Sequence, residues 1–201
     1  MSLTLRATLL IGFAAVCAQA QTRTLGLYAG SARGLNAESR LVMKAELKRL
    51  LEPAGIEIVW KDSAGRRSGE DFELIAVSSF EGSCSPEGPA QIPASASLAD
   101  TSISDGHVLP FFRVDCARLI QMLGRHIGSS VLGRALARVI AHEIYHIVAR
   151  TADHQETGVA KAIFSAQDLT DSRFEFDSWS ILLMRPSSVA GVSKAFGAAS
   201  R

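Results

Sequence analysis

The sequence predicts an α+β domain in which helices pack on a small mixed sheet. Two observations predict this fold class: short strand-like segments recur along the first half of the chain, and helical segments separate and follow them. The chain has 201 residues, 47% of them hydrophobic, and a formal net charge of +1. These values are typical of one globular domain, and they argue against disorder and against a general binder of nucleic acid or anionic membranes.

The elements are expected in the order strand, helix, strand, strand, strand, helix, helix. Asn36 is a helix-capping residue type, and Pro53 with Gly55 ends the first helix. Pro110 lies inside the fourth strand and places that strand at a sheet edge, because proline cannot donate to a sheet ladder. Strands are predicted at 24–29, 56–60, 72–79 and 107–114, and helices at about 37–52, 116–123 and 131–149.

Two of the helices have informative hydrophobic patterns. The first is expected to bury an apolar face made of Leu41, Ala45, Leu47, Leu50 and Leu51. The last, at 131–149, is hydrophobic on nearly every side, which predicts a buried central helix. Burying histidines in such a helix is costly unless they have partners, so the histidines that it carries need a function.

The first twenty residues read as an export signal. Arg6 precedes an apolar run at 7–16, and the small residues Ala18 and Ala20 match the pattern read by signal peptidase. The run is too short to span a bilayer, and no later segment is long enough, so no stable membrane insertion is expected. We therefore expect a secreted or periplasmic mature chain, with cleavage near Ala20, a domain at 21–186 and a weakly patterned tail at 187–201.

Two cysteines remain after removal of the signal. Cys84 and Cys116 are expected to form one disulfide, because an oxidising compartment favours it and neither has the spacing of a metal-binding knuckle. Two buried free thiols are the alternative.

The central motif is Ala141-His142-Glu143-Ile144-Tyr145-His146, an H-E-x-x-H. Residues four apart share one helical face, so His142 and His146 can both direct a nitrogen at a single Zn²⁺ ion. Glu143 lies beside the metal and can take a proton from a water molecule that zinc has made acidic. The motif arises by chance in about 0.7% of sequences of this composition.

A catalytic zinc also needs a third protein ligand, for which His154 is the favoured candidate because imidazole suits zinc. The alternatives are the acids Glu175, Asp168, Asp153 and Glu156. His107 and His126 are expected at the surface, and Trp60 and Trp179 are expected to be packing residues.

The exported H-E-x-x-H chain with a third histidine close behind resembles the zincin metallopeptidases, and the metzincin group in particular. The resemblance covers 25–169 in element order and 142–161 in motif. It implies a zincin-like sheet with a backing helix and a buried active-site helix. It also implies hydrolysis of peptide or protein substrates, zinc held by His142, His146 and His154, and Glu143 as general base and acid. The arrangement is also similar to secreted bacterial proteins of unassigned function.

The chain departs from the metzincin pattern in two places. That pattern would put glycine at 149 and histidine at 152, where this chain has Ala149 and Ala152. A methionine turn is also expected, and Met184 is the only later candidate. These departures keep two other hypotheses open: a zinc-stabilised binding or inhibitor module without peptidase activity, and an exported structural protein that carries the motif by chance and binds no metal.

Overall fold

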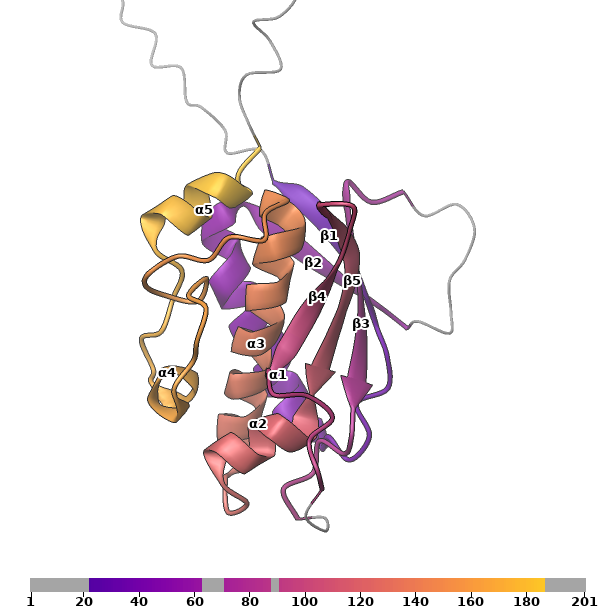
Figure 1. The fold of residues 1–201 in the computed structure, drawn as a ribbon, viewed down its shortest axis with the longest axis vertical. Helices are drawn as coiled ribbons and strands as arrows, with labels where there is room; N and C mark the ends of the chain where they lie inside the picture. The colour runs from indigo at the N-terminus through magenta and orange to yellow at the C-terminus, as the bar shows by residue number, and fades with distance from the viewer. Residues whose placement is uncertain (1–21, 63–70, 88–90, 187–201) are drawn as a thin grey trace, which may run out of the picture.

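A five-stranded sheet forms one layer of the fold, and the helices lie on one side of it (Figure 1). The structure, a computed structural model, describes residues 22–62, 71–87 and 91–186. The predicted export signal at 1–20 and the predicted tail at 187–201 lie outside these residues. The strands are β1 (Arg23–Ala29), β2 (Ile56–Asp62), β3 (Leu74–Glu81), β4 (Ala99–Ser104) and β5 (His107–Asp115). The helices are α1 (Ala37–Leu51), the short 3₁₀ helix η1 (Glu52–Ala54), α2 (Cys116–Leu123), α3 (Ser129–Ala149), α4 (Ala166–Thr170) and α5 (Ser178–Met184).

The predicted mixed α+β class is confirmed. The strand order is β2-β1-β3-β5-β4; the first four strands in this order are parallel, and β4 alone pairs antiparallel, with β5. Helices α1 and α3 cover one face of the sheet, and the segment that carries α4 and α5 lies on the other side of α3 (Figure 1). The hydrophobic core lies between the sheet and these two helices.

The prediction that the strand containing Pro110 is an edge was wrong. That strand, β5, is paired on both sides, and the edge beside it is β4, a strand that was not predicted. Pro110 is tolerated because it lies in an irregularity: the β4–β5 register shifts between Thr101 and Ile103, and pairing with β3 begins only at Phe111.

Helix α1 begins as predicted, but its buried face differs from the prediction. The Asn36 side chain caps the helix by accepting a hydrogen bond from the backbone N–H of Ser39 at 2.8 Å. Leu41 is 69% exposed and Ala45 is also exposed, whereas Met43 is buried with Leu47. Leu41 lies two residues before Met43, and Ala45 lies two residues before Leu47. Two residues correspond to about 200° round the helix, so Leu41 and Ala45 face solvent.

Helix α3 is the buried central helix that the composition predicted, with fifteen buried residues from Leu132 to Val148. It packs closely on α1 at Gly133, where a Cβ atom would lie 2.4 Å from the carbonyl oxygen of Ser39. Glycine is therefore required at this crossing. The close packing fixes the direction of α3 and so the positions of the histidines near its end.

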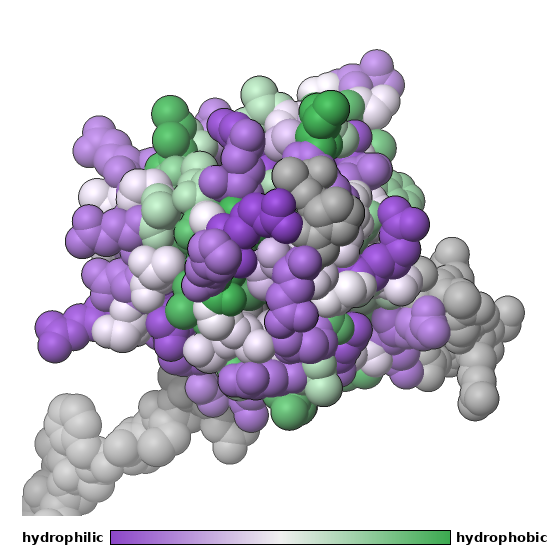
Figure 2. Space-filling model, turned by 90° about the horizontal axis from the view of Figure 1, so that it is seen from below, coloured by the Kyte–Doolittle hydropathy of each residue, from purple (hydrophilic) through white to green (hydrophobic). Residues whose placement is uncertain are grey.

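One face of the domain is mostly polar. Hydrophilic residues dominate the face seen in Figure 2, and the hydrophobic residues on it are scattered. Trp179 is 56% exposed, so its prediction as a packing residue was wrong; Trp60 is half-buried, with the Lys44 ammonium 5.0 Å from its ring centre. Within the described residues, none of the helices combines the length and apolar composition that crossing a membrane requires.

Cys84 and Cys116 form the expected disulfide, with their Cα atoms 4.9 Å apart. The bond joins the loop after β3 to the first residue of α2 and closes a loop with a sequence separation of 32. On the chain-entropy account such a loop contributes about 3 kcal/mol to stability.

Replacing both cysteines by serine is expected to lower the free energy of unfolding in urea by about this amount, and a loss below about 1 kcal/mol would contradict the account.

Candidate metal centre

Three histidines from α3 and the segment after it meet at one point. His142, His146 and His154 each offer a ring nitrogen, and these nitrogens all lie within 4.8 Å of one another. The rings of His142 and His154 stack at 5.2 Å between centres, and the His146 ring stands edge-on to both. The arrangement could hold a metal ion.

The end of α3 brings His154 back to the two helical histidines. Arg150 ends the helix in the left-handed conformation, with φ 52°, and the N–H groups of Arg150 and Thr151 both donate to the carbonyl oxygen of His146. The chain therefore turns without the glycine that the metzincin pattern has at 149. This turn makes room for a ligand two positions later than in that pattern.

Two backbone carbonyl groups fix the protonation of the helical histidines. His142 Nδ1 lies 2.7 Å from the carbonyl oxygen of Val159, and His146 Nδ1 lies 2.8 Å from that of Thr151. A carbonyl oxygen can only accept a hydrogen bond, so each Nδ1 atom carries a proton and donates it. Each Nε2 atom then has a free lone pair.

These two free lone pairs face each other, because the Nε2 atoms of His142 and His146 are only 3.1 Å apart. Burial lowers the pKa of His142 to about 4 and also lowers the pKa of His146, so both rings are neutral near pH 7 and no proton separates the two nitrogens. Two lone pairs at this distance repel each other. A cation between them removes this repulsion, so the donor set fits a metal ion.

Glu143 lies beside this cluster in a nearly dry environment. Its side chain is 4% exposed, and burial raises its pKa to about 7, against the opposing effect of a hydrogen bond from Thr101. The Thr101 hydroxyl donates to Glu143 Oε2 at 2.5 Å. A carboxylate with this high proton affinity can both take and return a proton near neutral pH.

The cluster opens into a cavity of about 610 Å³. Its walls come from Ala99–Thr101 of β4, from Val139 and Glu143 of α3, and from the segment Lys161–Phe164. Phe164 is buried and stands edge-on to His142, with 5.3 Å between ring centres. The cavity therefore brings a mostly apolar wall, a sheet edge and the histidine cluster together.

Two of the four acidic alternatives for the third ligand have other partners, and the other two are exposed. Asp168 accepts hydrogen bonds from Lys161 Nζ at 2.7 Å and from Ser165, whose side chain caps α4. Glu175 pairs with Arg49 Nη1 at 2.6 Å. Asp153 and Glu156 are exposed, and neither belongs to the histidine group.

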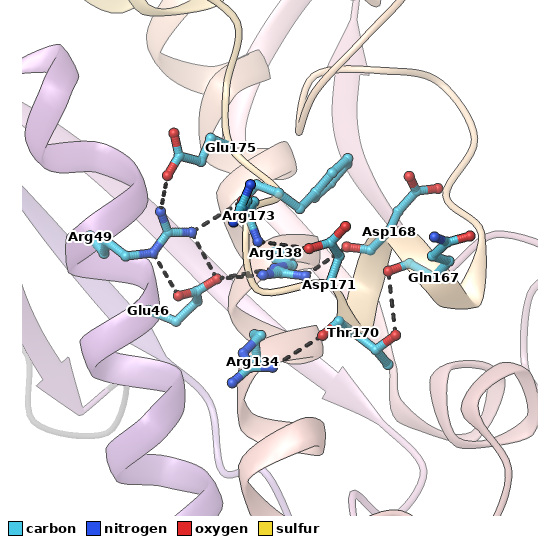
Figure 3. A network of polar contacts seen from close by, with 11 residues as sticks. Glu46, Arg49, Arg134, Arg138, Gln167, Asp168, Thr170, Asp171, Arg173 and Glu175 are labelled. Carbon is cyan, nitrogen blue, oxygen red and sulfur yellow. Dashed lines mark hydrogen bonds and ion pairs between the residues drawn. The ribbon is translucent and has the colours of Figure 1, made fainter.

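An arginine network attaches the segment 168–175 to helices α1 and α3 (Figure 3). Arg138 is fully buried on α3; its Nε donates to Glu46 at 3.1 Å and its Nη1 donates to the carbonyl oxygen of Asp168 at 2.7 Å. Arg49 of α1 binds the same Glu46 and also the carbonyl oxygen of Phe174 at 3.1 Å. These bonds attach the chain around 168–175 to both core helices.

The same segment places the carbonyl group that orients His142. The N–H of Val159 donates to the carbonyl oxygen of Glu175 at 3.0 Å. Gly158, with φ 69°, permits this approach, because a Cβ there would lie 2.6 Å from that oxygen. The arginine network therefore helps to position the Val159 carbonyl group behind His142.

Several predicted residues lie away from the cluster. His107 and His126 are exposed, as expected. Met184 is buried at the end of helix α5 and does not lie in a turn. Its carbonyl oxygen accepts a hydrogen bond from Arg23, and Met184 does not line the cavity.

Thr101 and the two carbonyl groups behind the histidines were not predicted from the sequence. The signal for Thr101 was present: Asp105-Gly106 is a typical two-residue hairpin turn, and both residues have positive φ in the structure. A hairpin there implies a strand before His107, which is β4.

No protein-family model matches the chain, and none of the curated proteins compared with it is a match.

Proposed function

We propose that this chain is an exported zinc-dependent metallopeptidase of the zincin type. The observation that supports this proposal best is the close approach of the Nε2 atoms of His142 and His146, which lie 3.1 Å apart next to a third histidine. Two nitrogens bound to one tetrahedral zinc at 2.0–2.1 Å lie about 3.3 Å from each other, close to the separation of this pair. Imidazole ligands suit zinc, and a three-ligand set leaves a position open, as a catalytic site requires.

Each polar group of the cluster then has a role. A zinc ion held by the three histidines would polarise a carbonyl group and make a water molecule acidic. Glu143 takes the proton from the attacking water and returns it to the leaving amine. The carbonyl groups of Val159 and Thr151 keep the imidazole rings oriented, in the way that outer hydrogen-bond partners support metal ligands.

The edge strand β4 supports a peptide as the substrate. Its residues Ala99–Thr101 line the cavity, and its outer edge is one of the two unpaired edges of the sheet. An extended peptide can add to such an edge through main-chain hydrogen bonds, which places its backbone along the cavity. The neighbouring strand β5 is not available for this role, because it is paired with β3 on one side and with β4 on the other.

Export is supported by the Cys84–Cys116 disulfide, which is typical of oxidising compartments. We propose that residues 1–20 are the cleaved signal. Sequencing the N-terminus of the exported protein tests this, with a start near Gln21 expected.

Hydrolysis of a mixed peptide pool by the purified mature chain tests the proposed activity. We expect cleavage that stops when a chelator removes the metal and returns when zinc is added, because the histidines alone cannot activate water. Unchanged cleavage in the presence of the chelator, after metal analysis has shown that no metal remains, would contradict a zinc mechanism.

A zinc-stabilised binding module is the second candidate. The position of Met184 favours it, because the expected methionine turn is replaced by the end of helix α5. In this case the same chain would bind zinc and retain peptides from the pool without cleaving them.

A further inference from the structure

We propose that Thr101 is a positioning residue for Glu143, whose hydroxyl holds one carboxylate oxygen so that the other is presented to the reacting water. This inference rests on the proposed function. It concerns a residue of β4 that lies 42 positions from Glu143 in the sequence.

The geometry of the contact is specific. Thr101 Oγ1 donates to Oε2 of Glu143 at 2.5 Å, a short distance that is typical of a hydroxyl bound to a charged carboxylate. Within residues 22–62, 71–87 and 91–186, the other oxygen, Oε1, has no hydrogen-bond partner. The two oxygens of this carboxylate therefore differ: one is held by the strand and one is left for chemistry.

Thr101 faces the helices from the edge strand β4. Thr101 pairs with Phe112 across the β4–β5 ladder, and Phe112 is 3% exposed in the core, so Thr101 belongs to the helix-facing side of the sheet. A valine would fit this position equally well by shape. What valine lacks is the donor for a carboxylate that is itself 4% exposed.

The contact also links two parts of the site. Thr101 lies on the strand along which a substrate peptide would add, and Glu143 is the base that acts on that peptide. A rigid hydrogen bond between strand and base fixes their relative position, and a displacement of about 1 Å in such an arrangement can cost about 100-fold in rate.

Three variants of the zinc-loaded mature chain test the inference. Thr101→Val is expected to keep its zinc and to lower kcat by about 10- to 100-fold with little change in KM, because the hydroxyl orients the base and does not bind substrate. Thr101→Ser keeps the hydroxyl and is expected to retain kcat within about 3-fold. Thr157→Val, the same substitution at an exposed position that does not line the cavity, is the control and is expected to match the wild type. Wild-type kcat in Thr101→Val, or an equal loss in Thr101→Ser, would overturn the inference.

A second measurement separates this inference from the proposed function. The Thr101→Val substitution is introduced into the wild type and into the Glu143→Leu variant. We expect it to lower the melting temperature in the wild-type background only, because only that background has a buried carboxylate that loses its donor. If the wild type cleaves no peptide, the proposed function fails and this comparison alone decides whether Thr101 holds the carboxylate. Equal shifts in the two backgrounds would overturn the inference.

Discussion

Replacing Glu143 by glutamine is expected to lower peptide hydrolysis by about 10²- to 10⁴-fold while zinc remains bound, which is the range that general acid–base catalysis contributes. Glutamine has nearly the same shape as glutamate and cannot take a proton from water. Glu143 is not one of the three histidine ligands, so its loss leaves the donor set intact. The measurements are kcat on a peptide selected from the pool and the zinc content of the purified variant.

Glu156→Gln is the matched control for this variant. Glu156 is an exposed glutamate in the segment that follows His154, and it does not belong to the histidine group. It is expected to hydrolyse peptides at the wild-type rate. A Glu143→Gln protein that is as fast as this control would exclude Glu143 as the general base.

Replacing His154 by alanine is expected to weaken zinc binding by more than about 100-fold. The loss of a mere outer hydrogen-bond partner costs about 10- to 100-fold in metal affinity, and the loss of a direct ligand costs more. His154 is exposed, so its replacement leaves no buried cavity and the fold should remain intact. Competition with a zinc-binding dye measures the affinity, and the melting temperature of the metal-free chain verifies the fold.

Two further variants separate a ligand role from a general effect. Glu175→Ala removes the acid that pairs with Arg49 and is expected to keep zinc affinity close to that of the wild type. His107→Ala removes an exposed histidine elsewhere on the surface and should also bind normally. Full zinc retention in His154→Ala, or a loss of equal size in Glu175→Ala, would exclude His154 as the third ligand.

The parts of the fold that the sequence predicted well are those with strong local signals. Helix α3 is hydrophobic on nearly every side, and Asn36, Pro53 and Gly55 mark the ends of the α1 region, so both helices were found close to their observed bounds. The H-E-x-x-H spacing likewise acts over one helical turn. It predicted correctly that His142 and His146 would lie together.

The parts that were missed depend on contacts between distant segments. Strand β4 is polar and half-exposed, so its sequence lacks a hydrophobic signal. Its partner β5 was predicted to be the edge because proline cannot donate a hydrogen bond to a neighbouring strand. The buried Arg138 is held by Glu46, which is 92 residues away, and no local pattern reveals such a pairing. The same is true of the carbonyl group of Val159 behind His142, since backbone groups leave no mark in a sequence.

The metal content of the purified mature chain tests the central claim most directly. The cluster of His142, His146 and His154 is expected to hold one zinc ion per chain, measured by elemental analysis after the protein has been equilibrated with a mixture of divalent metals and freed of excess ions. A chain that retains no zinc under these conditions would contradict both the zinc site and the peptidase built on it.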